Sequence, residues 1–244
     1  MNTAEPTHRI YWEDDHCFEA DARLVAVRGN EAAFDRTCFY PGGGGQPHDT
    51  GAVRFGGAEA IDVLSVQAGA DDIVWHALSL PVDPGRVGTP ARLRVDTERR
   101  LAFMRYHTVL HILNTIALRN FGGWITGVQI STGYSRIDFN LEGFSAAMRA
   151  ELEEKVNAVI AAGHALKSYY LSEGEFQDRK DLLRTLEARP LVYRGRVRVV
   201  EIEGFDAQAC GGTHMSTTSE VGVFSIFKTE NKGRINKRLY VRLM

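Results

Sequence analysis

The chain has 244 residues, a formal net charge of −2 and 44% hydrophobic residues. This length predicts one large domain or two small ones, with enough apolar side chains for a buried core. The near-neutral charge argues against a bulk nucleic-acid binder, so contacts with phosphates would depend on local clusters. No basic segment followed by an apolar run opens the sequence, and no stretch approaches the roughly 20 apolar residues of a membrane span. We therefore expect a cytoplasmic protein without membrane contact.

The three cysteines are Cys17, Cys38 and Cys210. An odd, sparse number fits a reducing compartment and a metal-binding or catalytic thiol better than a disulfide framework. Cys17 and Cys38 have no candidate partners nearby in the sequence, so we interpret them as ordinary small residues. Arginines and lysines gather in residues 92–105 and 228–242. Each cluster is equally consistent with phosphate contacts and with solvated surface charge.

The first 95 residues read as short strands separated by turn residues such as Gly29-Asn30 and Gly56-Gly57. Several short strands without a long helix predict a small N-terminal antiparallel β-barrel, which would form a domain over residues 1–95. The expected strands cover residues 20–28, 32–40, 52–55, 60–67, 72–78 and 89–95.

The pattern changes at Asp96, where Asp96 or Thr97 can cap a helix that runs to about residue 119 and ends at Gly122-Gly123. A single strand is expected over 126–140, and apolar residues at helical spacing predict a helix over 145–162. A strand over 165–171, a helix over 173–187 and strands over 197–202, 222–228 and 239–243 follow. Strands and helices mix without strict βαβ alternation, so residues 96–244 predict an α+β domain with a mixed sheet.

Two pairs of metal-ligand residues are the most informative feature of the chain. His107 and His111 are four residues apart in RYHTVLHIL, and Cys210 and His214 are four apart in ACGGTH. On a helix, positions i and i+4 lie on the same face, so the first pair can hold one ion from one side. A thiolate and a third imidazole from a distant loop would complete a tetrahedral nitrogen and sulfur set, which zinc favours.

Two other interpretations of these residues stay open. Four protein ligands favour a closed zinc site that only ties the helix to the loop, because catalytic zinc usually keeps one position open. Cys210 beside a histidine also fits a nucleophile. The missing glutamate after His107 argues against a zincin peptidase.

Three further segments are candidates for substrate contact. Glycines at Gly211 and Gly212 would let backbone N–H groups of the 211–213 segment, which ends at Thr213, approach a substrate oxyanion. Four successive glycines occupy positions 42–45 in FYPGGGGQPHDTG, which suggests close backbone approach, although a wide hairpin loop is the simpler alternative. Gln129, in GVQISTGYSRIDF, could orient a substrate; an outward-facing glutamine is the default interpretation.

Taken together, these segments resemble the editing domain of alanyl-tRNA synthetase and, more closely, its free-standing relatives, the AlaX trans-editing proteins. The resemblance covers FYPGGGGQPHDTG, RYHTVLHIL, GVQISTGYSRIDF, the VNAVI helix and DAQACGGTHMSTTSEVGVF, in the family's order over most of the chain. The chain has no room for an aminoacylation domain and is similar to the medium-length AlaX type. In this alignment, Gly42 replaces an acidic residue that is frequent in the family.

The resemblance implies a hydrolase that deacylates misacylated tRNA(Ala), chiefly seryl-tRNA(Ala) and also glycyl-tRNA(Ala), with the tRNA acceptor end as its partner and no protein partner. It implies one Zn²⁺ at His107, His111, Cys210 and His214. Gln129 corresponds to a glutamine important for editing, and Thr126 lies near a hydroxyl that senses serine. The glycine-rich loop, represented by Gly43, Gly44, Gly45 and Gln46, would lie near the acceptor end. The alternatives are a non-catalytic tRNA-binding module with structural zinc and a deacylase of other specificity, such as one for Ser-tRNA(Thr).

Overall fold

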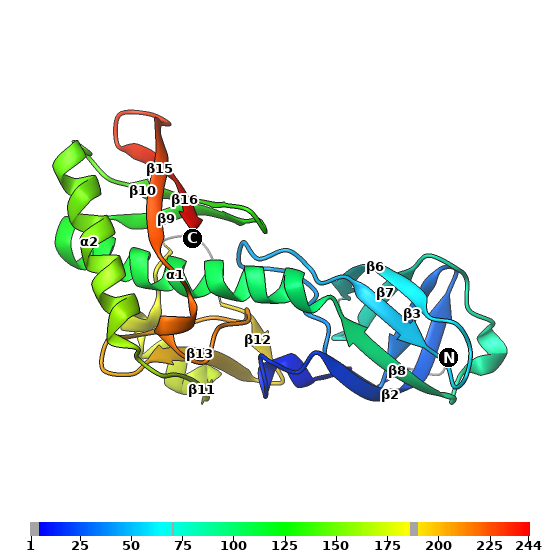
Figure 1. Cartoon of the computed structure of the whole chain (residues 1–244). Coiled ribbons are helices and arrows are strands. Elements are labelled where there is room, and N and C mark those ends of the chain that lie inside the picture. Colours follow the sequence, from blue (N-terminus) through cyan, green and yellow to red (C-terminus); the bar gives the residue numbers. More distant parts are fainter. Residues whose placement is uncertain (1–4, 70, 186–189) are drawn as a thin grey trace. The chain divides into compact units, whose positions relative to one another are not determined.

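The computed structural model describes residues 5–69, 71–185 and 190–244 and divides into two compact units (Figure 1). Unit 1 comprises the chain up to Gly43 together with Pro47–Leu101, and unit 2 comprises Gly44–Gln46 together with Ala102–Met244. A closed antiparallel barrel, further sheets and helices confirm the expected α+β class. No helix in the described ranges combines the length and apolar character needed to cross a bilayer. Independent folding of residues 1–95 and 96–244 stays a prediction.

Unit 1 is a closed six-stranded barrel, as predicted. Exposed and buried residues alternate over the first six residues of β2 (Glu19–Arg28) and along the whole of β8 (Pro90–Val95). Every second side chain there points into the barrel, where Leu24 and Leu93 are fully buried. Closure leaves no unpaired strand edge in the barrel. In barrel order the strands are β2 (Glu19–Arg28), β3 (Glu31–Phe34), β7 (Val74–Leu78), β6 (Ile61–Ala68), β5 (Gly51–Arg54) and β8 (Pro90–Val95).

The strand expected over residues 32–40 was too long. Strand β3 ends at Phe34, and after Asp35 a short strand, β4 (Arg36–Thr37), pairs in parallel with β1 (His8–Arg9) instead. Asp35 at the break gives the physical reason, since its carboxylate accepts a hydrogen bond from the backbone N–H of Arg23 at 2.7 Å. A side chain that bonds to the backbone competes with the strand ladder.

The two N-terminal cysteines, interpreted from the sequence as ordinary small residues, lie close to one another in the fold. Cys38 is fully buried, and Cys17, half-buried, lies within hydrogen-bonding reach of it. This contact lowers the pKa of Cys17 to about 7. The same contact, together with burial, raises the pKa of Cys38. Both are free thiols. The two thiols therefore differ in pKa because they lie close together in the fold, which their spacing in the sequence does not reveal.

His76 is a buried polar side chain inside the barrel. Its Nε2 lies 2.9 Å from Thr37 Oγ1 and its Nδ1 lies 3.2 Å from the carbonyl oxygen of Ala32. Burial disfavours the charged imidazolium and lowers the pKa of His76 to about 4.

The barrel is therefore expected to lose stability as the pH falls from 6.5 to 4. In this window the unfolded chain binds a proton at His76 and the folded chain does not, so the free energy of unfolding decreases with decreasing pH. The loss is on the order of 3 kcal/mol. Denaturant unfolding of the wild type and of His76→Gln at pH 7, 5.5 and 4 measures it, since other titrating groups are shared. Parallel pH profiles for the two proteins would contradict the prediction.

Helix α1 (Thr97–Phe121) carries the first pair of candidate ligands. Asp96 caps it, because its Oδ1 accepts from the backbone N–H of Arg99 at 3.1 Å. Gly122 follows with φ of 67°, and its N–H donates to the carbonyl of Leu118 at 3.0 Å. This left-handed residue ends the helix, as predicted.

A four-stranded antiparallel sheet in the order β15-β16-β10-β9 lies beside α1 in unit 2. Its strands are β9 (Trp124–Ile130), β10 (Ser135–Asn140), β15 (Phe224–Asn231) and β16 (Asn236–Leu243). The single strand expected over 126–140 was wrong, because residues 131–134 turn the chain and β10 pairs back onto β9. Gly133 lies in this turn, but the alternating sequence pattern continues across it and gave no sign of the turn.

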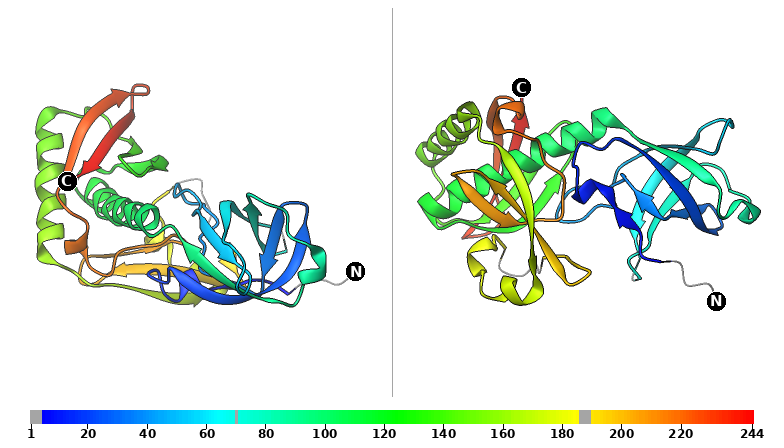
Figure 2. Two further views of the ribbon diagram at one scale, coloured as in Figure 1. Left: turned by 45° about the vertical axis from the view of Figure 1, so that its right-hand side comes forward. Right: turned by 90° about the horizontal axis from the view of Figure 1, so that it is seen from below.

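Helix α2 (Ala146–Ala162) was predicted correctly and packs against β15 (Figure 2). Ser145 is its N-cap and accepts from the backbone N–H of Met148. The Asn157 side chain donates to the carbonyl of Phe224 and accepts from its N–H, both at 2.9 Å. The helix thereby satisfies backbone groups at the end of an edge strand.

A second sheet in unit 2 leads into the loop with the other candidate ligands. It contains β11 (Leu166–Ser172), β13 (Arg196–Ile202), β12 (Val192–Tyr193) and β14 (Asp206–Ala209), all paired antiparallel. We expected a sheet with both parallel and antiparallel strands in this part of the chain. Among the described residues of unit 2, the only parallel pairing is one isolated bridge between Ile125 and Thr185.

The helix expected over residues 173–187 was too long. Helix α3 (Glu173–Gln177) is a single capped turn, followed by a short 3-10 helix, Lys180–Leu182. Ser172 and Glu175 form a reciprocal capping box, which explains the start of α3 but gives no length. The last two residues of the expected helix lie outside the described ranges.

Candidate metal centre

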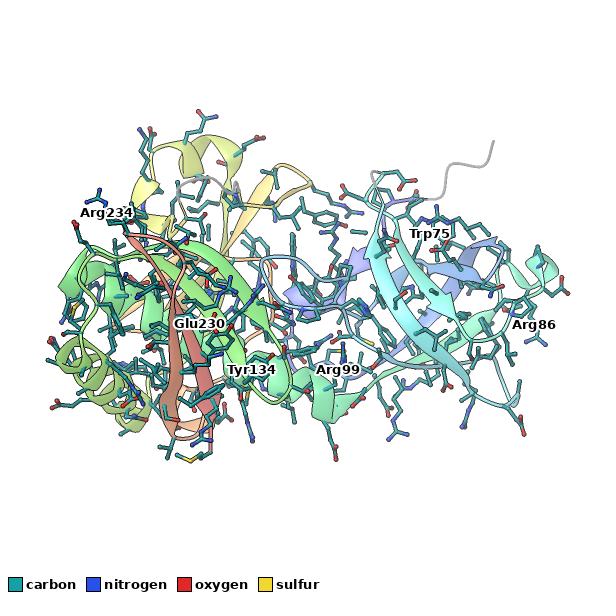
Figure 3. The ribbon with its side chains drawn as sticks, turned by 90° about the horizontal axis from the view of Figure 1, so that it is seen from above. Trp75, Arg86, Arg99, Tyr134, Glu230 and Arg234 are labelled. Carbon is teal, nitrogen blue, oxygen red and sulfur yellow. The ribbon has the colours of Figure 1, made fainter. Side chains whose placement is uncertain are left out.

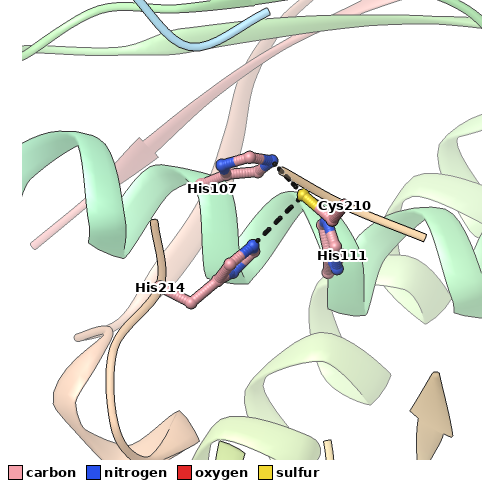
Figure 4. A group of neighbouring side chains, drawn as sticks. All are labelled: His107, His111, Cys210 and His214. Carbon is pink, nitrogen blue, oxygen red and sulfur yellow. Dashed lines mark hydrogen bonds between the residues drawn. The ribbon is translucent and has the colours of Figure 1, made fainter. Parts of the chain in front are cut away.

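The four predicted ligands come together within unit 2 (Figure 4). One nitrogen or sulfur atom from each of His107, His111, Cys210 and His214 lies within 4.8 Å of the others. Cys210 Sγ is 3.4 Å from His107 Nε2 and 3.4 Å from His214 Nε2. The three imidazoles are almost fully buried and Cys210 is half-buried.

Local structure explains this convergence. Helical spacing places His107 and His111 on one face of α1. Pairing of β14 with β13 directs the chain toward α1, and the N–H of Cys210 continues this ladder by donating to the carbonyl of Arg198 at 3.0 Å. The following loop then turns back to bring His214 to the same point.

The three imidazoles are neutral near pH 7. Burial lowers the pKa of His111 to about 3 and those of His107 and His214 well below 6.5. Neighbouring imidazoles and the Arg198 guanidinium act in the same direction on His107 and His214. A neutral imidazole keeps a nitrogen lone pair available, so the cluster is ready to bind a cation.

The residues fit a metal ion by their chemistry. Imidazole and thiolate donors suit a borderline or soft cation and disfavour magnesium and calcium. His111 Nδ1 is buried and has no hydrogen-bond partner among the described residues. A buried polar atom without a partner is costly, so an unsatisfied ring inside a cluster of donors is consistent with an external ligand. The cluster is therefore compatible with a site for one metal ion.

Gln46 orients the first of these ligands. Its Oε1 accepts from the backbone N–H of Thr213 at 3.1 Å, and its Nε2 donates to Thr213 Oγ1 at 2.9 Å. A backbone N–H can only donate, so these two bonds fix which end of the amide is oxygen. That oxygen lies 2.8 Å from His107 Nδ1, which must carry the proton. His107 Nε2 is thereby left as the free lone pair beside Cys210.

Replacing Gln46 by methionine is expected to weaken metal binding about 10- to 100-fold, because the His107 tautomer and ring orientation lose their support. Competition with a chromogenic chelator measures the affinity. Gln46→Glu keeps the acceptor and should retain more affinity than Gln46→Met. Gln67→Met, at an exposed barrel position, is the matched control. Equal metal affinities for Gln46→Met and the control would remove the orienting role.

Gly212 lies where a side chain would collide with His107. A Cβ atom built on Gly212 would lie 2.2 Å from His107 Cε1. Its N–H donates to Cys210 Sγ at 3.4 Å, and its carbonyl accepts from the Arg198 guanidinium at 2.7 Å. The sequence suggested that glycines here serve an oxyanion; the structure adds a packing reason. The N–H groups of Gly212 and Thr213 already have acceptors, Cys210 Sγ for Gly212 and Gln46 Oε1 for Thr213.

Two supporting residues were missed by sequence reasoning. Thr108 Oγ1 lies 3.3 Å from His214 Nδ1 and accepts from the N–H of Met215 at 3.1 Å, so one hydroxyl joins α1 to the loop. Arg198 is 2% exposed and holds the loop carbonyls. The position of Thr108 directly after His107 was a usable signal. For Arg198 the sequence offered no signal except a charged residue within an otherwise apolar strand.

The glycine-rich segment needs glycine for conformation and for space. All four glycines at positions 42–45 have positive φ, between 58° and 129°. The carbonyl of Gly45 accepts from the N–H of Ile130 at 2.9 Å, and a Cβ on Gly45 would lie 2.6 Å from Val128 Cγ1. Gly45 therefore lies against the edge of β9. Gly43 carries a carbonyl that accepts from Tyr40 Oη at 3.0 Å.

Gln129 and Thr126 lie on the exposed side of β9. Gln129 pairs across the sheet with Arg136 and does not enter the buried cluster. Thr126 Oγ1 donates to Asn236 Oδ1 at 3.2 Å. Both side chains are thus open to solvent and to a ligand on that face.

The comparisons with known proteins all point to proteins of alanyl-tRNA or threonyl-tRNA metabolism. Residues 197–240 match the family model described as the threonyl and alanyl tRNA synthetase second additional domain. An alanyl-tRNA editing protein AlaX-M from Methanosarcina mazei is 36% identical over 98% of this chain and 97% of its own length. The chain belongs to the AlaX-M family of alanyl-tRNA editing proteins. Another AlaX-M, from Saccharolobus solfataricus, is 36% identical over 96% of this chain and 98% of its own length.

Synthetases match this AlaX-M family member over a smaller part of their length. The alanine–tRNA ligase of Korarchaeum cryptofilum is 35% identical over 91% of this chain, which corresponds to 25% of the ligase. The predicted resemblance to an alanyl-tRNA synthetase editing domain and to AlaX proteins is confirmed.

Proposed function

We propose that this protein is a zinc-containing hydrolase that deacylates mischarged tRNA(Ala), chiefly Ser-tRNA(Ala) and also Gly-tRNA(Ala). The observation that carries the proposal is the buried cluster of three imidazoles and one thiol in a chain of the AlaX-M family. The reaction is the attack of water on the ester that joins the amino acid to the terminal adenosine.

Zinc is the metal that the donor set favours, held by His107, His111, Cys210 and His214. When bound, zinc supplies a Lewis acid that can polarise a carbonyl oxygen or a water molecule. The protein's own contribution is to hold the four side chains in place through Gln46, Thr108 and Arg198. The alternative of a purely structural zinc stays open, since four protein ligands are typical of closed sites.

The remaining candidate residues are proposed to act on the aminoacyl ester. Gln129, exposed on β9, would position the aminoacyl group through its amide. The backbone of the 211–213 segment is the candidate for binding the developing oxyanion. Its Gly212 and Thr213 N–H groups would have to exchange their present acceptors to do so. The backbone at Gly43, Gly44 and Gly45 would approach the acceptor end.

Thr126→Val is expected to reduce the preference for serine over alanine. A pocket that hydrogen-bonds the serine hydroxyl leaves its own polar group unpaired when alanine enters, and valine removes that group while keeping the shape. In the present structure the Thr126 hydroxyl donates to Asn236, and the substrate hydroxyl would replace this partner. The ratio of kcat/KM for Ser-tRNA(Ala) and Ala-tRNA(Ala) measures the effect. An unchanged ratio would discard this assignment.

Release of labelled amino acid from Ser-, Gly- and Ala-tRNA(Ala) and from Ser-tRNA(Thr), with and without a chelator, tests the proposed function. Chelator-sensitive release of serine and glycine from tRNA(Ala) alone supports it. Release from Ser-tRNA(Thr) at a similar rate would assign a different tRNA specificity. Binding of tRNA(Ala) without release of any amino acid would identify a non-catalytic tRNA-binding module.

A further inference from the structure

Three aromatic side chains gather on the exposed face of the sheet β15-β16-β10-β9. Tyr134, in the turn between β9 and β10, is 46% exposed, and Phe227 on β15 is 41% exposed. The ring centroid of Tyr134 is 6.1 Å from that of Phe227, and each lies 6.1–6.2 Å from the half-buried ring of Tyr240 on β16. Tyr134 lies beside the β15-β16 hairpin in Figure 3. We call this group the aromatic platform.

A β-bulge creates the platform. The pairing of β15 with β16 shifts between Ile226 and Lys228, so Phe227 is an extra residue opposite β16. In a regular strand, Phe227 and Lys228 would point to opposite faces. With the bulge, both are exposed and both lie beside the ring of Tyr240. A bulge re-aims a side chain at the expense of ladder hydrogen bonds, and here it turns a phenylalanine toward solvent.

Cations border the aromatic platform. Lys228 Nζ lies 5.0 Å from the ring centroid of Tyr240, and the Arg242 guanidinium lies 5.7 Å from that of Phe227. Arg136 pairs directly with Tyr240 across the sheet. Of the two carboxylates nearby, Glu230 accepts from Tyr240 Oη at 3.1 Å and is bound by two lysines. Asp138 is bound by Arg238 at 2.6 Å.

After these ion pairs, the outward positions carry an excess of positive charge. The cations around the platform are Arg136, Lys228, Lys232, Arg238 and Arg242, and the anions are Asp138 and Glu230. A cationic face with exposed rings attracts a polyanion that also offers flat apolar groups.

The aromatic platform is linked to the candidate metal centre inside unit 2. Tyr106, directly before His107 on α1, donates from its hydroxyl to the carbonyl of Gly133 at 2.8 Å, next to Tyr134. In the sheet, Gln129 pairs with Arg136 and Arg136 with Tyr240, so these three residues form one cross-strand row. A chain of nucleotides on the platform would thus run along the row that contains Gln129.

We propose that Tyr134, Phe227 and Tyr240 stack on the unpaired nucleobases at the 3′ end of the tRNA substrate. Every base has an apolar π face that can stack on an aromatic ring, and stacking needs no sequence-specific hydrogen bond. The phosphate of each nucleotide would pair with the bordering cations. Tyr134 and Phe227 are exposed, which a structural role would not require. The proposal rests on the proposed function, because it names where that substrate's end is held.

A matched pair of RNA ligands tests the aromatic platform. The first is a tRNA(Ala) acceptor minihelix that ends in its unpaired nucleotides, and the second lacks these nucleotides. Phe227→Ser and Tyr134→Ser are expected to weaken binding of the first ligand at least about fivefold each and to leave binding of the second unchanged. Fluorescence anisotropy at fixed ionic strength measures both affinities. Tyr170→Ser, at a tyrosine that is 37% exposed on β11, is the control for loss of an exposed ring.

Each other outcome overturns the proposal. Equal weakening of both ligands would assign these rings to the duplex, and wild-type affinity of both variants for both ligands would show that no base stacks there. A change only in self-association, measured by sedimentation, would make this face an interface between two copies of the chain. Failure of the proposed function is distinguishable, since it would abolish release of amino acid while the platform still binds the unpaired end.

Discussion

Replacing Cys210 by serine is expected to abolish stoichiometric zinc binding and deacylation together. The serine hydroxyl is not ionised near pH 7, so the cluster would lose its anionic ligand and keep three buried neutral imidazoles. Zinc affinity should fall by more than about a hundredfold, since loss of a supporting residue alone costs 10- to 100-fold. Metal analysis of the purified protein and release of labelled serine from Ser-tRNA(Ala) measure the two quantities.

The control for this substitution is Cys17→Ser, which alters a free thiol in unit 1 and should leave the zinc content unchanged. His107→Ala provides a second test of the same site. Loss of zinc from Cys210→Ser with serine release at the normal rate would show that the metal is structural. Full zinc content in both variants would mean that these side chains do not form the site.

Gly212→Ala is expected to have the next largest effect. The new Cβ would overlap His107 Cε1 at 2.2 Å and approach Gln46 Oε1 at 2.9 Å. Either His107 turns away from Cys210 or the loop moves, and overpacking of this kind costs about 1–3 kcal/mol of stability. We expect a lower midpoint of thermal unfolding and a reduced zinc content. Differential scanning calorimetry and metal analysis measure them.

Gly174→Ala is the matched control, because nothing lies within 4 Å of the Cβ position at Gly174. Wild-type zinc content and stability in Gly212→Ala would show that the loop relaxes without displacing His107. In that case the glycine would be needed for the backbone conformation and not to make space for His107. The interpretation of this segment as an oxyanion-binding backbone would then be favoured.

Short-range patterns carried most of what the sequence predicted correctly. The i and i+4 spacing placed His107 and His111 on one helix face, and Asp96 and Gly122 marked the ends of that helix. Strand alternation and turn residues gave the barrel, because a closed sheet needs one apolar face on every strand. These features depend on neighbours within about one helical turn or one strand.

Long-range pairing supplied what the sequence did not predict. The hydrogen bond between Gln46 and His107 joins residues 61 apart, and that between Gln46 and Thr213 joins residues 167 apart. No local pattern distinguishes Gln46, which was proposed as a substrate contact, from other loop glutamines. The turn at Gly133 was missed for a related reason, since alternation continues across it and only the pairing of β10 onto β9 reveals the break.

The four candidate metal ligands are divided between α1 and a distant loop, with 103 residues between His107 and Cys210, and this division has a consequence for biosynthesis. A nascent chain that has emerged only as far as residue 200 carries two of the four, and two imidazoles alone bind a divalent ion weakly. The ion can therefore be captured only after the ribosome has delivered the ACGGTH segment. Until then α1 carries only His107 and His111, and the set of four is complete once His214 has been synthesised.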